Sequence, residues 1–184
     1  YSDESLSAES KLDGAPVNAG TYWLVAKVAA GEDYTSLTSA AVEFTVAKAN
    51  NSWTTQPSID GWTYGEAANA PVGTAQFGTV VFEYYSDESL SAESKLDGAP
   101  VNAGTYWLVA KVEEGEDYTS LTSSVEFVIA KATNSWTTQP SIEGWTYGEA
   151  ANAPAGKAQF GTVVFEYYSD ESLSAESKLD GAPV

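Results

Sequence analysis

The side chains that could do chemistry in this sequence are mostly carboxylates. The chain contains 26 Asp and Glu residues but no His and no Cys. A glycosidase needs two carboxylates placed across a concave site, whereas the acidic residues here cluster in apparent loops, at Asp87, Glu88, Glu93, Glu116 and Asp117. Nucleophilic catalysis has no visible machinery, because the G-x-S-x-G turn is also absent from the sequence. We therefore expect a protein that is not an enzyme.

Calcium binding is a second chemistry open to clustered carboxylates, because hard cations prefer oxygen ligands. The segment VEEGEDY offers four of them, at Glu113, Glu114, Glu116 and Asp117. The matching segment VAAGEDY keeps only Glu32 and Asp33, and neither segment has D-x-D-x-D-G spacing. We therefore expect no cofactor, with calcium near residues 113–117 as the alternative.

Aromatic side chains form the third candidate group, at Trp53, Trp62, Trp107 and Tyr85. Flat strips of aromatic residues can bind a glycan, but they also seal contacts between neighbouring domains. For Trp107 we favour the second interpretation, in which a neighbouring loop or the next domain covers the ring.

The elements that would position these residues belong to a long internal repeat. The segment NAGTYWLVAKV spans residues 18–28 and returns at 102–112, while NSWTTQPSI spans 51–59 and returns at 134–142. The shift is 84 residues in the first case and 83 in the second, because TSLTSAAVEF is one residue longer than TSLTSSVEF. Such a period exceeds the roughly 20 to 50 residues of solenoid repeats and is close to the size of a small β-sandwich. Each repeat should therefore be a domain.

Strands are expected throughout, because apolar and polar residues alternate and no helical stripe is sustained. In GTYWLVAKV (104–112), the set predicted to face the core is Tyr106, Leu108, Ala110 and Val112. The set predicted to face outward is Thr105, Trp107, Val109 and Lys111. Two further segments show the same alternation, with Val125, Phe127 and Ile129 on one face, and with Val80, Phe82 and Tyr84 opposing Val81, Glu83 and Tyr85. About seven short strands per repeat predict an all-β sandwich.

A tyrosine near the start of one strand makes the prediction more specific. Immunoglobulin-type sandwiches place a tyrosine two residues before an inward-facing position of the penultimate strand, where its hydroxyl bonds to the backbone. Tyr106 precedes Leu108 in this way, and Tyr22 precedes Leu24. We therefore interpret Tyr22 and Tyr106 as structural tyrosine corners.

With AGTY at the start of a strand, GEDY in the next loop and AKA at the end of the last strand, the chain resembles the tandem immunoglobulin-like repeats of large bacterial cell-surface proteins and adhesins. The resemblance implies tandem immunoglobulin-like β-sandwich repeats of about 83 residues. It also implies an extracellular location, at the cell surface or in a secreted filament, and carries over no catalytic residue.

The repeat boundaries divide the chain into one complete repeat and two partial ones. Residues 1–48 form the C-terminal part of a first repeat, 49–131 a complete repeat, and 132–184 the N-terminal part of a third. Each partial repeat would expose half a core and unpaired strand edges. Residues 132–184 and 18–48 together have the length of one repeat. Two interpretations stay open: a window of a long tandem array within one chain, or separate chains that complete one another head to tail.

The composition limits the partners. A formal net charge of -18 disfavours nucleic acid and acidic membrane surfaces, and no apolar run is long enough to span a membrane. We expect the partners to be neighbouring copies of the same repeat, with a glycan as a further possibility.

These observations predict a structural stalk, spacer or fibre-forming repeat of an extracellular surface protein. The alternative is an adhesin or carbohydrate-binding module that uses exposed aromatic residues. A spacer predicts that Trp107 is covered, whereas a glycan-binding module predicts that it lies open on a flat or concave face.

Overall fold

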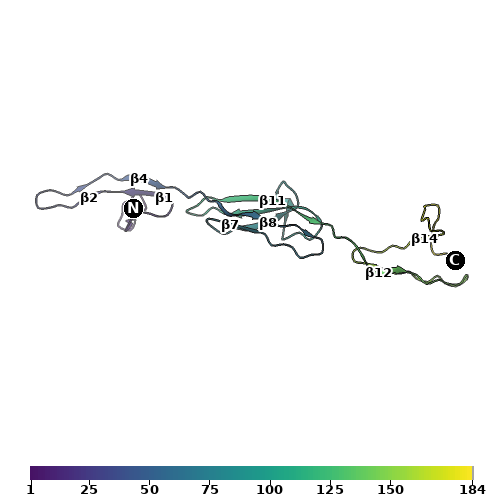
Figure 1. The fold of residues 1–184 in the computed structure, drawn as a ribbon. Coiled ribbons are helices and arrows are strands. Elements are labelled where there is room, and N and C mark those ends of the chain that lie inside the picture. The colour runs from purple at the N-terminus through teal and green to yellow at the C-terminus, as the bar shows by residue number, and fades with distance from the viewer. Residues whose placement is uncertain (184) are drawn as a thin grey trace. The chain divides into compact units, whose positions relative to one another are not determined.

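The structure is a computed structural model that describes residues 1–183 (Figure 1). Strands account for 37% of the residues and helix for 2%, so the expectation of an all-β protein is confirmed. In residues 1–183 the helical content is a single 3-10 turn, η1 (Ala92–Ser94). None of the helical structure in this range has the length and apolar character needed to cross a membrane.

The strands follow the internal repeat. Residues 1–48 contain β1 (Gly20–Leu24), β2 (Lys27–Val28), β3 (Leu37–Thr38) and β4 (Val42–Val46). Residues 49–131 contain β5 (Trp53–Ser58), β6 (Trp62–Thr63), β7 (Val72–Ala75), β8 (Val81–Tyr85), β9 (Lys95–Leu96), β10 (Gly104–Val112) and β11 (Leu121–Ala130). The last part contains β12 (Trp136–Ser141), β13 (Ala155–Ala158), β14 (Tyr167–Tyr168) and β15 (Lys178–Leu179).

The chain divides into two compact units, Tyr1–Lys131 and Ala132–Val184. The division falls where the sequence places the end of the complete repeat. Residues 1–48 belong to the same unit as 49–131, because the two parts share hydrogen bonds that are described below.

The complete repeat, residues 49–131, is built on a five-stranded sheet of order β6-β11-β10-β8-β9. Its centre is the long antiparallel pair β10 and β11, whose register runs from Gly104 opposite Ile129 to Val112 opposite Leu121. Strand β6 joins the edge beside β11 in parallel orientation. A separate antiparallel pair, β5 and β7, forms a second sheet.

The core of this repeat lies where the two sheets meet. Its buried side chains are Ile59, Trp62, Leu108, Phe127 and Ile129, with Phe82, Tyr84 and Tyr106 packed against them. The Trp62 ring stacks on Phe127 with 5.4 Å between ring centroids. Alternation predicted the inward positions of Leu108, Phe127 and Ile129 correctly, because period-2 patterning reports which face of a strand is apolar.

The outer face of β10 differs from the expectation. Val109, predicted to face outward, is only 2% exposed. It lies opposite Glu83 in the register and between Trp107 and Lys111 along its own strand. Leu108 and Ala110 are buried as well, so both faces of β10 are buried at its centre.

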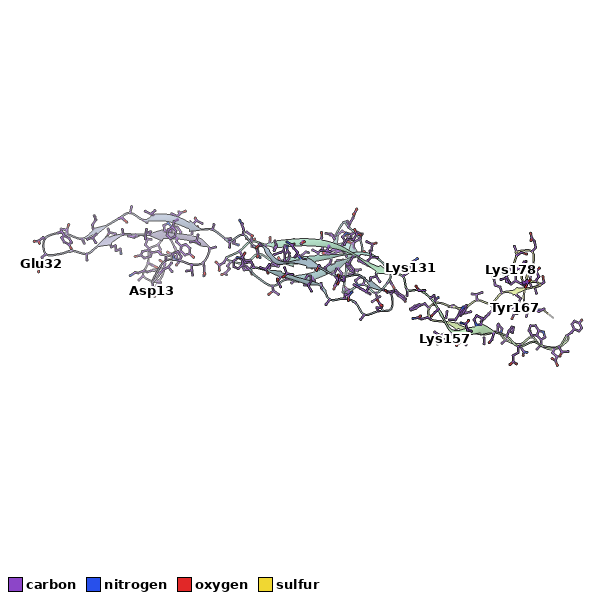
Figure 2. The ribbon with its side chains drawn as sticks, in the orientation of Figure 1. Asp13, Glu32, Lys131, Lys157, Tyr167 and Lys178 are labelled. Carbon is purple, nitrogen blue, oxygen red and sulfur yellow. The ribbon has the colours of Figure 1, made fainter. Side chains whose placement is uncertain are left out.

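The two partial repeats form short strand pairs instead of a complete sheet. In residues 1–48, β1 pairs with β4 and β2 pairs with β3. In the second unit, β12 pairs with β13 and β14 pairs with β15. The Glu32 side chain lies at the tip of the loop between β2 and β3, and Tyr167 and Lys178 lie on β14 and β15 (Figure 2).

Candidate functional site: the joint between repeats

The residues that connect the first partial repeat to the complete one are held by hydrogen bonds. The Ala49 N–H donates to the Asp117 carbonyl over 2.8 Å, and the Thr119 N–H donates to the Ala49 carbonyl over 3.0 Å. Ala49 thereby forms a parallel bridge with Tyr118. The linker therefore has little freedom to swivel, because both backbone polar groups of Ala49 are bound.

Two side chains of the acidic loop 113–118 contribute to this joint. The Lys48 Nζ contacts the Glu114 carboxylate at 2.5 Å and donates to the Gly115 carbonyl over 2.9 Å. The Ala19 N–H, from the preceding partial repeat, donates to the Asp117 carboxylate over 2.7 Å. The Lys48–Glu114 pair is largely exposed and adds little by itself. Its value is that it connects two repeats.

A stacked pair of aromatic rings supports the loop from behind. Tyr118 lies on Phe77 with 5.7 Å between ring centroids and an interplanar angle of 14°. The Tyr118 ring also lies against Gly115, where an added Cβ would approach the ring to 2.5 Å. The GEDY segment needs glycine at its first position, because no other side chain leaves room for the tyrosine ring.

Asn51 fixes the end of the linker. Its side chain accepts from the Phe77 N–H and donates to the Phe77 carbonyl, over 3.1 and 3.0 Å. Its own N–H donates to the Thr119 hydroxyl over 3.2 Å. Asn134 makes the same two side-chain bonds to Phe160 in the second unit. The Asn-Ser-Trp segment therefore begins each repeat in the same way.

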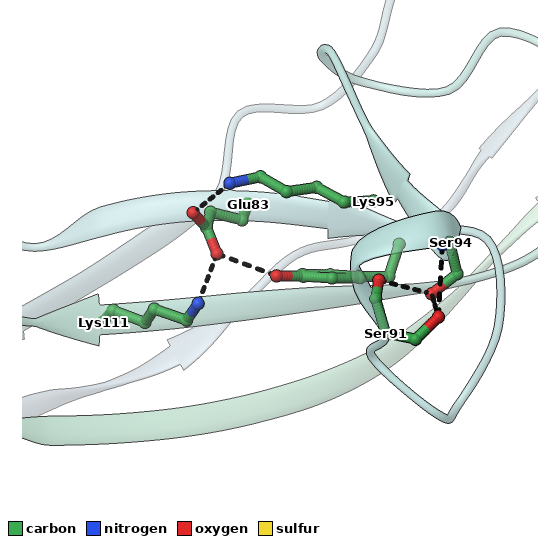
Figure 3. Close-up of polar contacts among 6 residues, drawn as sticks. Glu83, Ser91, Ser94, Lys95 and Lys111 are labelled. Carbon is green, nitrogen blue, oxygen red and sulfur yellow. Dashed lines mark hydrogen bonds and ion pairs between the residues drawn. The ribbon is translucent and has the colours of Figure 1, made fainter.

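A second polar cluster lies on the outer face of the five-stranded sheet (Figure 3). The Glu83 carboxylate accepts hydrogen bonds from Lys95 and Lys111, each over 2.5 Å, and from the Tyr85 hydroxyl over 2.9 Å. The bond from Lys111, followed by that from Lys95, lowers the pKa of Glu83 from its ordinary 4.5 to about 2. Glu83 also raises the pKa of Lys111. This cluster, with its three donors on one carboxylate, joins β8, β9 and β10.

The aromatic candidates are buried or half-buried within the fold. Trp62 is a core residue, and Tyr85 is buried with its hydroxyl bonded to Glu83, so the structure corrects the expectation that they offer contact surface. Trp53 and Trp107 are half-buried. Trp107 is therefore not the open ring that a glycan-binding face would present. The described contacts between residues 1–48 and 49–131 come from other residues.

The two tyrosines at the strand starts have the same environment. The Tyr106 hydroxyl donates to the Asn102 carbonyl over 3.1 Å, and the Tyr22 hydroxyl donates to the Asn18 carbonyl over 3.0 Å. Both bonds return to the backbone four residues upstream. In each case the bond closes the turn that leads into the strand.

The acidic residues considered as calcium ligands have different roles in the structure. Glu114 and Asp117 bind the linker and Ala19, while Glu113 and Glu116 are exposed. Within residues 1–183 no three acidic, His or Cys side chains come together as metal ligands. Sequence reasoning did not identify the bonds that Lys48, Ala49 and Asn51 make to the loop 113–119, although the position of these residues between the repeats was the available signal.

The segment 86–94 forms a serine-rich loop whose conformation depends on local bonds. The Asp87 carboxylate accepts from the Ser89 N–H over 2.9 Å, and the Ser91 hydroxyl accepts from the Ser94 N–H over 3.3 Å. The segments 2–10 and 169–177 repeat this pattern, with Asp3 and Asp170 as the accepting carboxylates. We refer to all three segments as the serine-rich loop.

Comparisons of the chain with protein-family models, with curated proteins and with solved structures gave no match.

Proposed function

We propose that this protein is a structural repeat of an extracellular stalk, spacer or fibre, in which consecutive immunoglobulin-like β-sandwiches are joined by short, hydrogen-bonded links. The observation that carries the proposal is the joint at Ala49, where the linker is bonded on both sides to a loop of the following repeat. A link of this kind maintains the orientation of one repeat relative to the next, whereas a flexible tether does not.

The strand order of the complete repeat supports the immunoglobulin-like part of the proposal. The neighbours β11, β10, β8 and β9 follow the order of the G, F, C and C′ strands of a variable-type sandwich. Tyr106 stands at the start of β10, the penultimate strand, where the tyrosine corner belongs. The second sheet is smaller than in that fold, with β5 and β7 alone.

The rival proposal, an adhesin or carbohydrate-binding module, depends on open aromatic rings. The half-buried state of Trp107 removes its main support. The acidic surface, with a net charge of -18, suits a spacer, because like charge limits association between neighbouring fibres.

Pulling on single molecules tests the proposal. With the chain attached at residues 1 and 183, the complete repeat should rupture in one cooperative event. Its contour length should then increase by about 3.5 Å for each residue released from 49–131. Extension without a discrete rupture would contradict a mechanical role. Glycan-dependent quenching of tryptophan fluorescence would instead favour the adhesin.

A further inference from the structure

The first and last segments of the complete repeat run side by side in the same direction. Ala49, at the start of the repeat, forms its parallel bridge with Tyr118, shortly before β11 begins. Strand β6 then pairs in parallel with the end of β11, where Thr63 lies opposite Ala130. These two contacts lie at opposite ends of β11. The chain therefore enters the repeat at one end of β11 and leaves it at the other.

Backbone contacts hold β6 against the end of β11. The Tyr64 N–H donates to the Ala130 carbonyl over 2.8 Å. Gly61 passes so close to β11 that an added Cβ would collide with the Val128 carbonyl oxygen. The Asn69 side chain fixes this close approach, because its amide donates to the Gly61 carbonyl over 3.0 Å. The position of β6 therefore depends on a glycine and on one amide side chain.

Side chains hold the same strand from both sides. Trp62 is 7% exposed and Ile129, opposite it on β11, only 1%. Away from the core, the Glu66 carboxylate accepts from the Thr63 N–H, and the Glu66 N–H donates to the Thr63 carbonyl, each over 2.9 Å. Strand β6 has only two residues, but its ring and its backbone are both bound.

Parallel pairing decides how these contacts respond to tension. When two neighbouring strands are parallel, a pull on the N-terminal end of one and the C-terminal end of the other slides them along each other. All the hydrogen bonds between the strands are then loaded together, because they are evenly spaced along the pair. A pull on two ends that lie side by side separates the bonds one after another. Tension between Ala49 and Lys131 is of the first kind, both at the Ala49 bridge and at β6.

We propose that β11 is the strand that carries force through the complete repeat, held by the entering chain at Ala49 and at β6. The proposal rests on the proposed function and names the element through which the force passes. Tension that reaches the joint enters residues 118–131 through the Ala49 bridge and leaves at Lys131, along a strand about 33 Å long. The links join residues 49 and 131, so β8, β9 and β10 are loaded only through β11.

Pulling the repeat in two directions tests the proposal. The sequence has no cysteine, so single-molecule handles can be attached to pairs of introduced cysteines. Ala47→Cys with Lys131→Cys loads β6 and β11 along their length. Ala67→Cys with Lys131→Cys pulls from the end that the two strands share. At equal force the second pair should rupture at least about tenfold sooner, because its hydrogen bonds break singly and each contributes only about 1 kcal/mol.

Two substitutions weaken the contact between β6 and β11. Gly61→Ala pushes β6 away from the Val128 carbonyl, and Asn69→Ala removes the amide that binds the Gly61 carbonyl. With handles at residues 47 and 131, each should shorten the time to rupture at constant force about three- to tenfold. The reason is that the lost contact stabilises the folded repeat but is already broken in the transition state. Asn69→Ala provides the result if Gly61→Ala does not fold.

Two controls address strands through which the force does not pass directly. Gly98→Ala adds the same methyl group where nothing lies near it, and should leave the time to rupture unchanged. Glu83→Gln weakens the cluster that joins β8, β9 and β10. It should lower the equilibrium stability but leave the time to rupture within about twofold of wild type, because this cluster is still intact when β6 and β11 separate.

Equal times to rupture in the two pulling directions would overturn the proposal. So would a Glu83→Gln variant that ruptures as early as Asn69→Ala, because the force would then pass through the whole sheet. Either result leaves the mechanical role intact if the repeat still ruptures in one discrete event between residues 47 and 131. Extension without a discrete event would contradict the mechanical role itself.

Discussion

Glu83 is the residue on which the outer face of the complete repeat most depends. Its side chain is 17% exposed and accepts from two lysines and a tyrosine. Its pKa of about 2 in the folded chain lies below the ordinary 4.5. The unfolded chain therefore binds more protons between these values, so the stabilisation is complete above about pH 4.5 and is lost as the pH falls toward about 2.

Glu83→Gln should lower the free energy of unfolding of the complete repeat by about 1–2 kcal/mol at neutral pH, allowing for solvent screening. The difference from wild type should shrink toward zero near pH 2. Urea unfolding at several pH values, followed by tryptophan fluorescence, measures this difference in the free energy of unfolding. Glu126→Gln, at an exposed position on β11 without a described ion pair, is the control. An equal loss of stability at every pH would contradict the assignment to the charged pair.

Tyr106→Phe removes one hydroxyl and leaves the ring that packs on Phe127. We expect a loss of about 1 kcal/mol from the complete repeat, because the Asn102 carbonyl loses its donor. Tyr22→Phe removes the same bond from residues 1–48 and should leave the denaturation midpoint of the complete repeat unchanged. Equal effects of the two variants would mean that the bond does not act locally.

At the scale of single elements, identical sequences form different strands. GTYWLVAKV forms the continuous strand β10 at 104–112, but at 20–28 it breaks into β1 and β2. The difference comes from the neighbours, because β8 pairs with Trp107 to Lys111 and places a second strand beside that edge. Strand formation depends on pairing and burial more than on intrinsic preference.

The same comparison shows how far sequence reasoning extends. Alternation predicted the inward faces of β10 and β11, because it reports polarity along one strand. It failed at Val109, which is buried although its position in the alternation is outward. The choice of Trp62 and Tyr85 as candidate contact residues was also wrong, because both are buried. The bonds at the joint could not be derived either, because the partners of Lys48 and Ala49 lie more than 60 residues further along the chain.

Amide exchange should distinguish the two copies of this strand. The N–H groups of Leu108, Val109 and Ala110 should exchange slowly, because they lie in the middle of a five-stranded sheet. Those of Leu24, Val25 and Ala26 should exchange much faster in dilute samples. Exchange mass spectrometry with fragments that separate the copies measures this, and similar rates in both would contradict the difference in pairing.

Gly115→Ala tests the joint as an element. The added methyl group would collide with the ring of Tyr118. The backbone of Tyr118 forms the bridge to Ala49. We expect faster backbone motion at residues 48–51 in 15N relaxation, with the core of the complete repeat retained. Gly98→Ala is the matched control, since nothing lies near its added methyl group. Unchanged motion at the linker would show that Tyr118 does not hold the joint.

At the scale of the whole molecule, charge opposes contact between chains. Each chain carries a net charge of -18, so two chains repel each other at long range. Salt screens this repulsion, because the Debye length shortens as ionic strength rises. The repulsion between chains should therefore weaken as ionic strength rises from about 0.01 to 0.15 M. Light scattering over a series of protein concentrations measures the repulsion, and a repulsion that does not change with salt would contradict the prediction.

The serine-rich loop occurs three times with the same local bonds, at residues 2–10, 86–94 and 169–177. Its conformation is independent of whether the surrounding repeat is complete, so a single antibody could recognise all three copies. A bivalent antibody would then bind with far greater avidity than its Fab fragment wherever two loops lie within its reach. To an immune system, this chain presents one epitope three times.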